Sequence, residues 1–221
     1  MVSDNFIPYK GLTYPAEETE KRSQEYYEYM NRRRTIREFS NKPVSKKVLE
    51  NIIMTASSAP SGAHKQPWTY CVIGNQDLKA RIRVDAEKEE FESYNGRMSE
   101  EWLKDLEPFK TDWNKPFLEV APWLIIVFKK AYDLTDGVKS KNYYVNESVG
   151  ISVGFLLSAI HNAGLVSLTH TPSPMNFLHK VLNRPENERA FLLIPVGYPQ
   201  ENTKVPDIKR KGLNEVIAFY E

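Results

Sequence analysis

A helix, a loop and a strand follow one another without interruption in residues 45–75, which read SKKVLENIIMTASSAPSGAHKQPWTYCVIGN. Ser45 is a suitable N-cap, and apolar residues then recur at helical spacing. Pro60-Ser61-Gly62 ends this helix, and residues 68–73 form a short β-rich run closed by a Gly-Asn pair. The stretch therefore predicts an amphipathic helix joined to a strand by a loop of small residues.

The chain on either side continues this alternation of helices and strands. We expect further helices at 17–33, 76–94, 149–165 and 175–182, and further strands at 123–129, 165–171 and 190–196. Residues 1–16 contain the breakers of an irregular arm, and residues 200–221 form a polar C-terminal arm. The order predicts an α+β fold in which helices cover a small sheet.

Two of these segments have unusual compositions. Residues 87–115 carry a heavy load of charge interrupted by aromatic residues, and we interpret them as a loosely packed helical insertion, or lid. Residues 149–165 are almost entirely apolar, so this helix belongs in a core or at a subunit interface.

The composition narrows the possible function classes. The chain has 221 residues, 41% hydrophobic and 27% charged, which suits one globular domain over residues 1–221. Its net charge of +1 gives no support to a nucleic-acid or membrane-surface role. No apolar run approaches the roughly 20 residues of a membrane span, and Met1–Asn5 lack the start of a signal peptide. The one cysteine, Cys71, excludes an internal disulfide and fits a cytoplasmic setting.

Several common site signatures are missing from the sequence. No Gly-x-Gly-x-x-Gly follows a strand and no Gly-x-x-x-x-Gly-Lys occurs, which argues against a Rossmann dinucleotide site and excludes a P-loop. No Gly-x-Ser-x-Gly elbow occurs. The four histidines form no His-Glu-x-x-His pattern, so we expect no metal site.

Four arginines gather within Arg32–Arg37, at the end of an expected helix. Guanidinium groups bind phosphate through paired hydrogen bonds, and Thr35 adds a hydroxyl donor. The alternative is a set of cations favoured at a helix C-terminus, or a solvated face. Lys209-Arg210-Lys211 is a second basic cluster, which either completes a phosphate site or only solubilises the tail.

The loop Ala59–Trp68 contains small residues and a glycine between a helix and a strand. Such residues let backbone amides approach a planar ligand closely. The alternative is simply a tight connection between the two elements. His64 has no evident acid partner, and we interpret it as a packed or solvated histidine.

The lid contains a carboxylate, a phenol and an ammonium group in Glu90, Tyr94 and Lys115. Glu90 and Tyr94 are four residues apart, so they share one helix face. The three groups complement an amino-acid zwitterion, with Glu90 accepting from its ammonium and Lys115 pairing with its carboxylate. The alternative is an ordinary charged surface helix.

The strand end Ser167–Pro172 is rich in hydroxyl groups, which can donate to an atom of a redox cofactor. The alternative is the ordinary preference of Thr for strands.

Together these segments resemble the FMN-dependent nitroreductase superfamily over about Tyr26–Val216. Arg33–Arg37 is similar to its Arg-Arg-Ser-Val-Arg flavin segment, and Ala59–His64 with Pro67-Trp68 is similar to its most characteristic loop. Further similar blocks are Asn162–Val166, Pro195–Pro199 and Val205–Lys211. The Glu90, Tyr94 and Lys115 lid resembles the branch of the superfamily that removes halogen from halotyrosines.

The resemblance implies a nitroreductase-like three-layer α-β-α fold with a small mixed sheet and helices on both faces. It also implies a helical lid at about 87–115, a C-terminal arm at about 200–221 and a domain-swapped homodimer. FMN would lie at the dimer interface, each site using both subunits. The implied flavin contacts are Arg33, Arg34, Thr35, Ile36, Arg37, Ser61, Thr169, His170, Thr171 and Arg210.

The resemblance implies different roles for these flavin contacts. Arg33, Arg37 and Arg210 would hold the phosphate and the polar edge of the flavin. The Thr171 hydroxyl would hydrogen-bond flavin N5, which makes Thr171 the expected catalytic residue. Ala63 would offer its backbone N–H to the substrate phenolate. His170 stands where the family usually has Thr, an exchange that keeps its backbone role.

The implied function is flavin-dependent reductive dehalogenation of halotyrosines, iodotyrosine giving tyrosine and iodide. The electron donor, NAD(P)H or a reductase, is not identified by the sequence. One alternative is a general NAD(P)H-dependent nitroreductase or quinone reductase. Another is a flavin- or halotyrosine-binding protein without turnover. Nucleic-acid binding through Arg32–Arg37 is disfavoured by the near-zero net charge.

Overall fold

The computed structural model describes residues 6–221, which fall into two compact units divided between Arg33 and Arg34. In the first unit, residues 6–15 are irregular, as expected, and helix α1 (Ala16–Asn31) follows. Residues 1–5, and with them the expectation about a signal peptide, lie outside the described residues.

Helix α1 is stabilised by local contacts rather than by a core. Glu17 and Glu18 lie in its first turn, where carboxylates favour the helix dipole. The Glu18 carboxylate also pairs with Arg22 one turn later, at 2.6 Å. No residue of α1 is buried.

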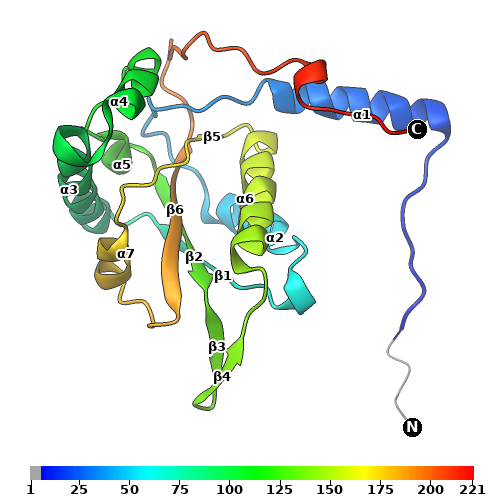
Figure 1. Ribbon diagram of the computed structural model, residues 1–221, viewed down its shortest axis with the longest axis horizontal. Helices are drawn as coiled ribbons and strands as arrows, with labels where there is room; N and C mark the ends of the chain where they lie inside the picture. Colours follow the sequence, from blue (N-terminus) through cyan, green and yellow to red (C-terminus); the bar gives the residue numbers. More distant parts are fainter. Residues whose placement is uncertain (1–5) are drawn as a thin grey trace. The chain divides into compact units, whose positions relative to one another are not determined.

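The second unit is built around a four-stranded sheet of order β1-β2-β6-β5 (Figure 1). Its strands are β1 (Trp68–Ile73), β2 (Trp123–Lys130), β5 (Val166–Ser167) and β6 (Glu188–Gly197). Neighbouring strands are antiparallel, whereas Thr35 forms a parallel bridge to Ser167 at the β5 edge. The expected small mixed sheet is therefore present. Among the described residues, its one parallel contact lies at the β5 edge.

Helices cover both faces of the sheet (Figure 1). Helices α2 (Lys46–Ser57) and α6 (Val145–Asn162) pack on one face, and α3 (Gln76–Glu92), α5 (Phe117–Val120) and α7 (Asn176–Val181) pack on the other. Strand β2 serves both cores, because Ile125 and Val127 join the first cluster while Leu124 and Ile126 join the second. This alternation confirms the three-layer α-β-α prediction and explains why β2 is continuously apolar.

The lid sequence, residues 87–115, begins within the C-terminal part of α3. A π-helical turn (η2, Ser93–Arg97), helix α4 (Glu100–Leu106) and a 3₁₀ turn (η3, Glu107–Phe109) continue the chain toward α5. Two further 3₁₀ turns are η1 (Gly62–His64) and η4 (Leu213–Glu215), the latter in an otherwise irregular C-terminal arm. Within residues 6–221, no helix combines the length and apolar character needed to cross a membrane.

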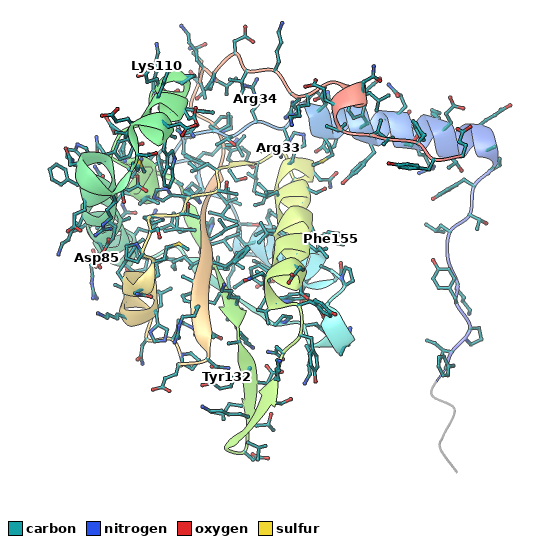
Figure 2. All side chains as sticks on the ribbon, viewed as in Figure 1. Arg33, Arg34, Asp85, Lys110, Tyr132 and Phe155 are labelled. Atoms are coloured by element: carbon teal, nitrogen blue, oxygen red, sulfur yellow. The ribbon has the colours of Figure 1, made fainter. Side chains whose placement is uncertain are left out.

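The structure departs from the expected elements in two places. The expected strand 165–171 is regular only over β5, after which His170 alone bridges to Leu193. A hairpin of β3 (Tyr132–Thr135) and β4 (Val138–Lys141) was not expected; Figure 2 labels Tyr132 at its start. Its turn is an Asp-Gly pair with φ of +51° and +80°, the chemistry that a two-residue hairpin loop favours.

Candidate active site

The basic segment after α1 lies along strand β5. The Ile36 backbone N–H donates to the Ser167 carbonyl at 3.2 Å, beside the Thr35–Ser167 bridge. The Arg34 guanidinium donates to the Pro206 carbonyl in the C-terminal arm (Figure 2). This pairing brings Arg34–Arg37 next to the strand end that carries the expected flavin contacts, an arrangement that sequence spacing alone does not show.

The other predicted phosphate ligands are placed differently. Arg33 belongs to the first unit, where its backbone N–H donates to the Met30 carbonyl at 3.1 Å. Arg210 lies exposed in the C-terminal arm. The Arg37 guanidinium lies 5.6 Å from the Phe109 ring centroid, and burial lowers its pKa while nearby Tyr94 acts to raise it. Arg37 therefore faces the lid, a contact between two segments that the sequence presented as separate.

The loop before β1 has a strongly constrained backbone. Ala63, His64 and Gln66 all have left-handed φ values, of +49°, +54° and +47°. The Ser61 side chain supports this shape, because its hydroxyl accepts from the Gln66 N–H at 2.9 Å. A Cβ at Gly62 would lie 2.9 Å from the Tyr143 carbonyl oxygen, so only glycine permits this approach.

Side chains along this loop remain accessible. Ala63, the residue expected to contact the substrate phenolate, is exposed. His64 is also exposed, with its Nε2 2.9 Å from the Gln66 amide nitrogen. The position of His64 fits the interpretation of a solvated histidine.

The lid carboxylate and ammonium form a buried ion pair. Glu90 lies near the end of α3 and Lys115 lies just before α5, with the carboxylate oxygen Oε2 3.3 Å from Nζ. Only 8% of Glu90 and 4% of Lys115 is exposed. The sequence suggested a loosely packed, charged lid. At this point the lid is instead tightly packed, because these two charges are enclosed together.

Further lid groups surround the Lys115 ammonium. It donates to the Thr111 hydroxyl at 3.3 Å and to the Asp112 carbonyl, and lies 5.3 Å from the Tyr94 ring centroid. Tyr94, in η2, shares a hydrogen bond with Thr111. Glu90, Tyr94 and Lys115 are thus brought together, as the zwitterion hypothesis requires.

Burial and pairing act in opposite directions on these charges. Burial raises the pKa of the Glu90 carboxyl, while Lys115 acts to lower it. Burial lowers the pKa of Lys115, while Glu90 acts to raise it. Each charge is therefore held in the interior chiefly by the other, or by a ligand that replaces the other.

The His170 side chain belongs to the same cluster, and sequence reasoning missed it. Its Nε2 lies 3.9 Å from the Glu90 oxygen Oε1, and its ring packs edge-on against Phe117. Burial lowers the pKa of His170 to about 3, with Lys115 and Arg37 acting in the same direction, so the imidazole is neutral near pH 7. The available signal was alternation, since buried Leu168 stands two residues earlier.

The neighbouring threonines face the other way. Thr169 and Thr171 are exposed, on either side of the buried His170. They follow Ser167, which bridges to Thr35 in the basic segment Arg34–Arg37. This combination of donors suits a flavin, because guanidinium groups complement a phosphate and hydroxyls can hydrogen-bond a polar ring edge.

Comparisons with known proteins show the family to which the chain belongs. The profile of the nitroreductase family matches residues 30–198. The iodotyrosine deiodinase of Haliscomenobacter hydrossis is 66% identical over 216 residues, which are 97% of each chain. Iodotyrosine deiodinase 1 of Homo sapiens is 45% identical over 214 residues, covering 96% of this chain and 74% of the human one.

Solved structures of nitroreductase-like proteins also match this chain. A crystal structure of oxidised iodotyrosine deiodinase bound to FMN and 3-iodo-L-tyrosine matches with a TM-score of 0.75 and 30% identity, over 88% of this chain and 100% of that one. A nitroreductase with bound FMN from Bacteroides fragilis matches with a TM-score of 0.66 and 18% identity, over 89% and 99% of the two chains. The second likeness concerns the fold alone.

Proposed function

The chain belongs to the nitroreductase family and, within it, to the iodotyrosine deiodinases, and on that premise we propose that it reductively removes halogen from halotyrosines. In the reaction the carbon–iodine bond breaks and a carbon–hydrogen bond forms. Iodotyrosine takes up two electrons and one proton, and tyrosine and iodide are released. The single observation that carries the proposal is the 66% identity to a deiodinase over 97% of both chains.

FMN is the cofactor of this reaction, and when bound it supplies the electrons, which side chains cannot. The residues present fit it, because the segment that carries Arg34 and Arg37 pairs through Thr35 with Ser167 of β5, two residues before the exposed Thr169. We propose that Arg33, Arg37 and Arg210 hold its phosphate and polar edge, and that the Thr171 hydroxyl hydrogen-bonds its N5. The remaining proposed contacts are Arg34, Thr35, Ile36, Ser61, Thr169 and His170.

The substrate's amino-acid end is assigned to the lid. Glu90 would accept from the substrate ammonium while Lys115 turns to its carboxylate, exchanging their mutual ion pair for two pairs with the ligand. Tyr94 already lies against Lys115, so it would close the same site. The backbone N–H of the exposed Ala63 would donate to the phenolate. Closure would exclude water from the reacting bond.

We propose a homodimer, with helix α6 in its interface. One side of α6 is in the core, yet Ile151 and Phe155 remain 45% and 40% exposed on another side. Beside them, a Cβ at Gly150 or Gly154 would meet no heavy atom within 4 Å. An exposed apolar stripe with small residues is typical of a surface that packs against another helix.

Three further assignments remain proposals. Residues 1–221 would act as one nitroreductase-like domain, because the family match crosses the division between the two units. The electron donor would be NAD(P)H or a reductase. The setting would be cytoplasmic, in keeping with a single cysteine.

The test is halide release by the purified, FMN-loaded protein. With dithionite as reductant, iodotyrosine should yield tyrosine and iodide in equal amounts. Rapid turnover of nitroaromatics with NAD(P)H and no preference for amino-acid ligands would favour a general nitroreductase. Quenching of flavin fluorescence by iodotyrosine without iodide release would identify a binding protein. A protein that stays colourless and takes up no added FMN would refute the proposal.

A further inference from the structure

His170 is held by β6 and α5, whereas the Glu90 carboxylate is carried by α3. Its backbone N–H donates to the Leu193 carbonyl at 2.9 Å, and its own carbonyl accepts from the Leu193 N–H at 3.0 Å. The ring packs at 89° against Phe117, with 5.6 Å between the ring centroids. His170 is therefore a fixed reference point on the sheet, whereas Glu90 is carried by α3.

The His170 ring ends in an unsatisfied polar atom. Nε2 is buried and has no hydrogen-bond partner among the described residues, and the His170 side chain is only 8% exposed. Buried polar atoms are nearly always paired, so an unpaired one calls for an explanation. The nearest acid is Glu90, whose Oε1 lies 3.9 Å away, about 1 Å beyond hydrogen-bond distance.

The two carboxylate oxygens of Glu90 face different partners. Oε2 pairs with Lys115, and Oε1 faces His170. The proposed substrate binding takes Lys115 away toward the substrate carboxylate and leaves Glu90 to hold the substrate ammonium. A buried carboxylate in that position needs a second donor to fix its orientation and to keep it ionised.

We propose that His170 is a positioning residue that donates its Nε2–H to Glu90 Oε1 when a halotyrosine is bound. This inference rests on the proposed function, and it assigns to the side chain a role beyond the backbone role expected of this position. The charged groups around the imidazole are Glu90 from α3, Lys115 from the segment before α5 and Arg37 from the segment after α1. Burial, and then the two cations, disfavour an imidazolium, so the ring donates as a neutral group and adds no charge.

The expected consequence for binding follows from the hydrogen bond. His170→Phe keeps a planar ring but removes the donor, so the Kd for iodotyrosine should rise about tenfold, the usual scale for a hydrogen bond to a charged group. Loss of a donor to the charged form also raises the Glu90 pKa, so affinity should begin to fall at higher pH than in the wild type. His170→Gln places an amide N–H at a similar reach, and should restore both properties.

The experiment measures iodotyrosine Kd by quenching of flavin fluorescence in FMN-loaded protein from pH 4.5 to 8, a range set by the Glu and His reference pKa values of about 4.3 and 6.5. The ionisable groups of iodotyrosine titrate identically in every experiment, so differences in the pH dependence of Kd between variants arise from the protein. A matched control is His179→Phe, because His179 lies on α7 and its Nε2 already meets the Pro185 carbonyl at 3.1 Å. This control should bind as the wild type does.

The outcomes separate the inference from its premise. The inference is supported if His170→Phe has a higher Kd and loses affinity at a higher pH than the wild type, while His170→Gln has the wild-type Kd and pH dependence. Wild-type Kd and pH profile in His170→Phe would overturn it. An equal rise of Kd in both His170 variants, with affinity falling at the same pH as in the wild type, would assign His170 a purely structural role and would also overturn the inference. Failure of the wild type itself to bind iodotyrosine would remove the proposed function.

Discussion

The buried pair of Glu90 and Lys115 gives the sharpest expectation for a single side chain. Lys115→Ala and Glu90→Gln each remove one of the two charges that the zwitterion needs, so KM for iodotyrosine should rise at least about tenfold, while FMN stays bound. Lys110→Ala, an exposed lid lysine labelled in Figure 2, is the matched control. Steady-state iodide release and flavin content are the measurements. Unchanged kinetics in both pair variants would rule out the lid assignment.

Thr171 is the residue whose hydroxyl we assign to flavin N5. Thr171→Ala removes this donor from the reacting end of the cofactor, so iodide release should slow about tenfold or more. Nitroaromatic reduction by the same protein should fall less, because we assign the hydroxyl to dehalogenation. Thr171→Ser keeps the hydroxyl and should recover most of the rate. Equal dehalogenation rates in the Ala variant and the wild type would contradict the assignment.

For single residues, the sequence predicts which side chains can bind a ligand better than it predicts which of them lie close together. The guanidinium groups of Arg34 and Arg37 and the hydroxyls after β5 could be proposed as flavin donors from residue type and family resemblance. Their closeness depends on the long-range pairing of Thr35 with Ser167, which no local pattern contains. The buried imidazole of His170 likewise depends on its bridge to Leu193, 23 residues farther along the chain.

At the scale of elements, Arg97 ties the lid to the loop that follows Thr171. One guanidinium nitrogen donates to Glu89 at 2.6 Å on α3 and to the Ser173 carbonyl at 3.2 Å. Arg97→Ala should therefore raise the iodotyrosine Kd several-fold with little change in Tm, since exposed ion pairs contribute little to stability. Arg81→Ala, on the exposed face of α3, is the control. A Kd equal to that of the control would show that this contact does not hold the lid.

Elements whose apolar residues repeat regularly were predictable, and elements stabilised by turns or pairing were not. Strand β2 and helix α2 extend almost as their apolar patterns indicate. No residue of β3 or β4 is buried, so the only sequence signal of this hairpin was the Asp136-Gly137 turn. Strand β5 is short because its neighbour β6 pairs regularly with it at only two residues.

For the whole molecule, the exposed stripe on α6 predicts association of two copies. Phe155→Glu would place an unpaired carboxylate in the proposed interface, a burial that costs several kcal/mol and should shift the protein toward the monomer. FMN affinity should fall with it, because each site is proposed to use both subunits. Light scattering and flavin retention on gel filtration measure the two effects. Val84→Glu, at an exposed apolar position on α3, is the matched control. A Phe155→Glu protein that stays dimeric and yellow, or a wild type that is monomeric with FMN bound, would remove α6 from the interface.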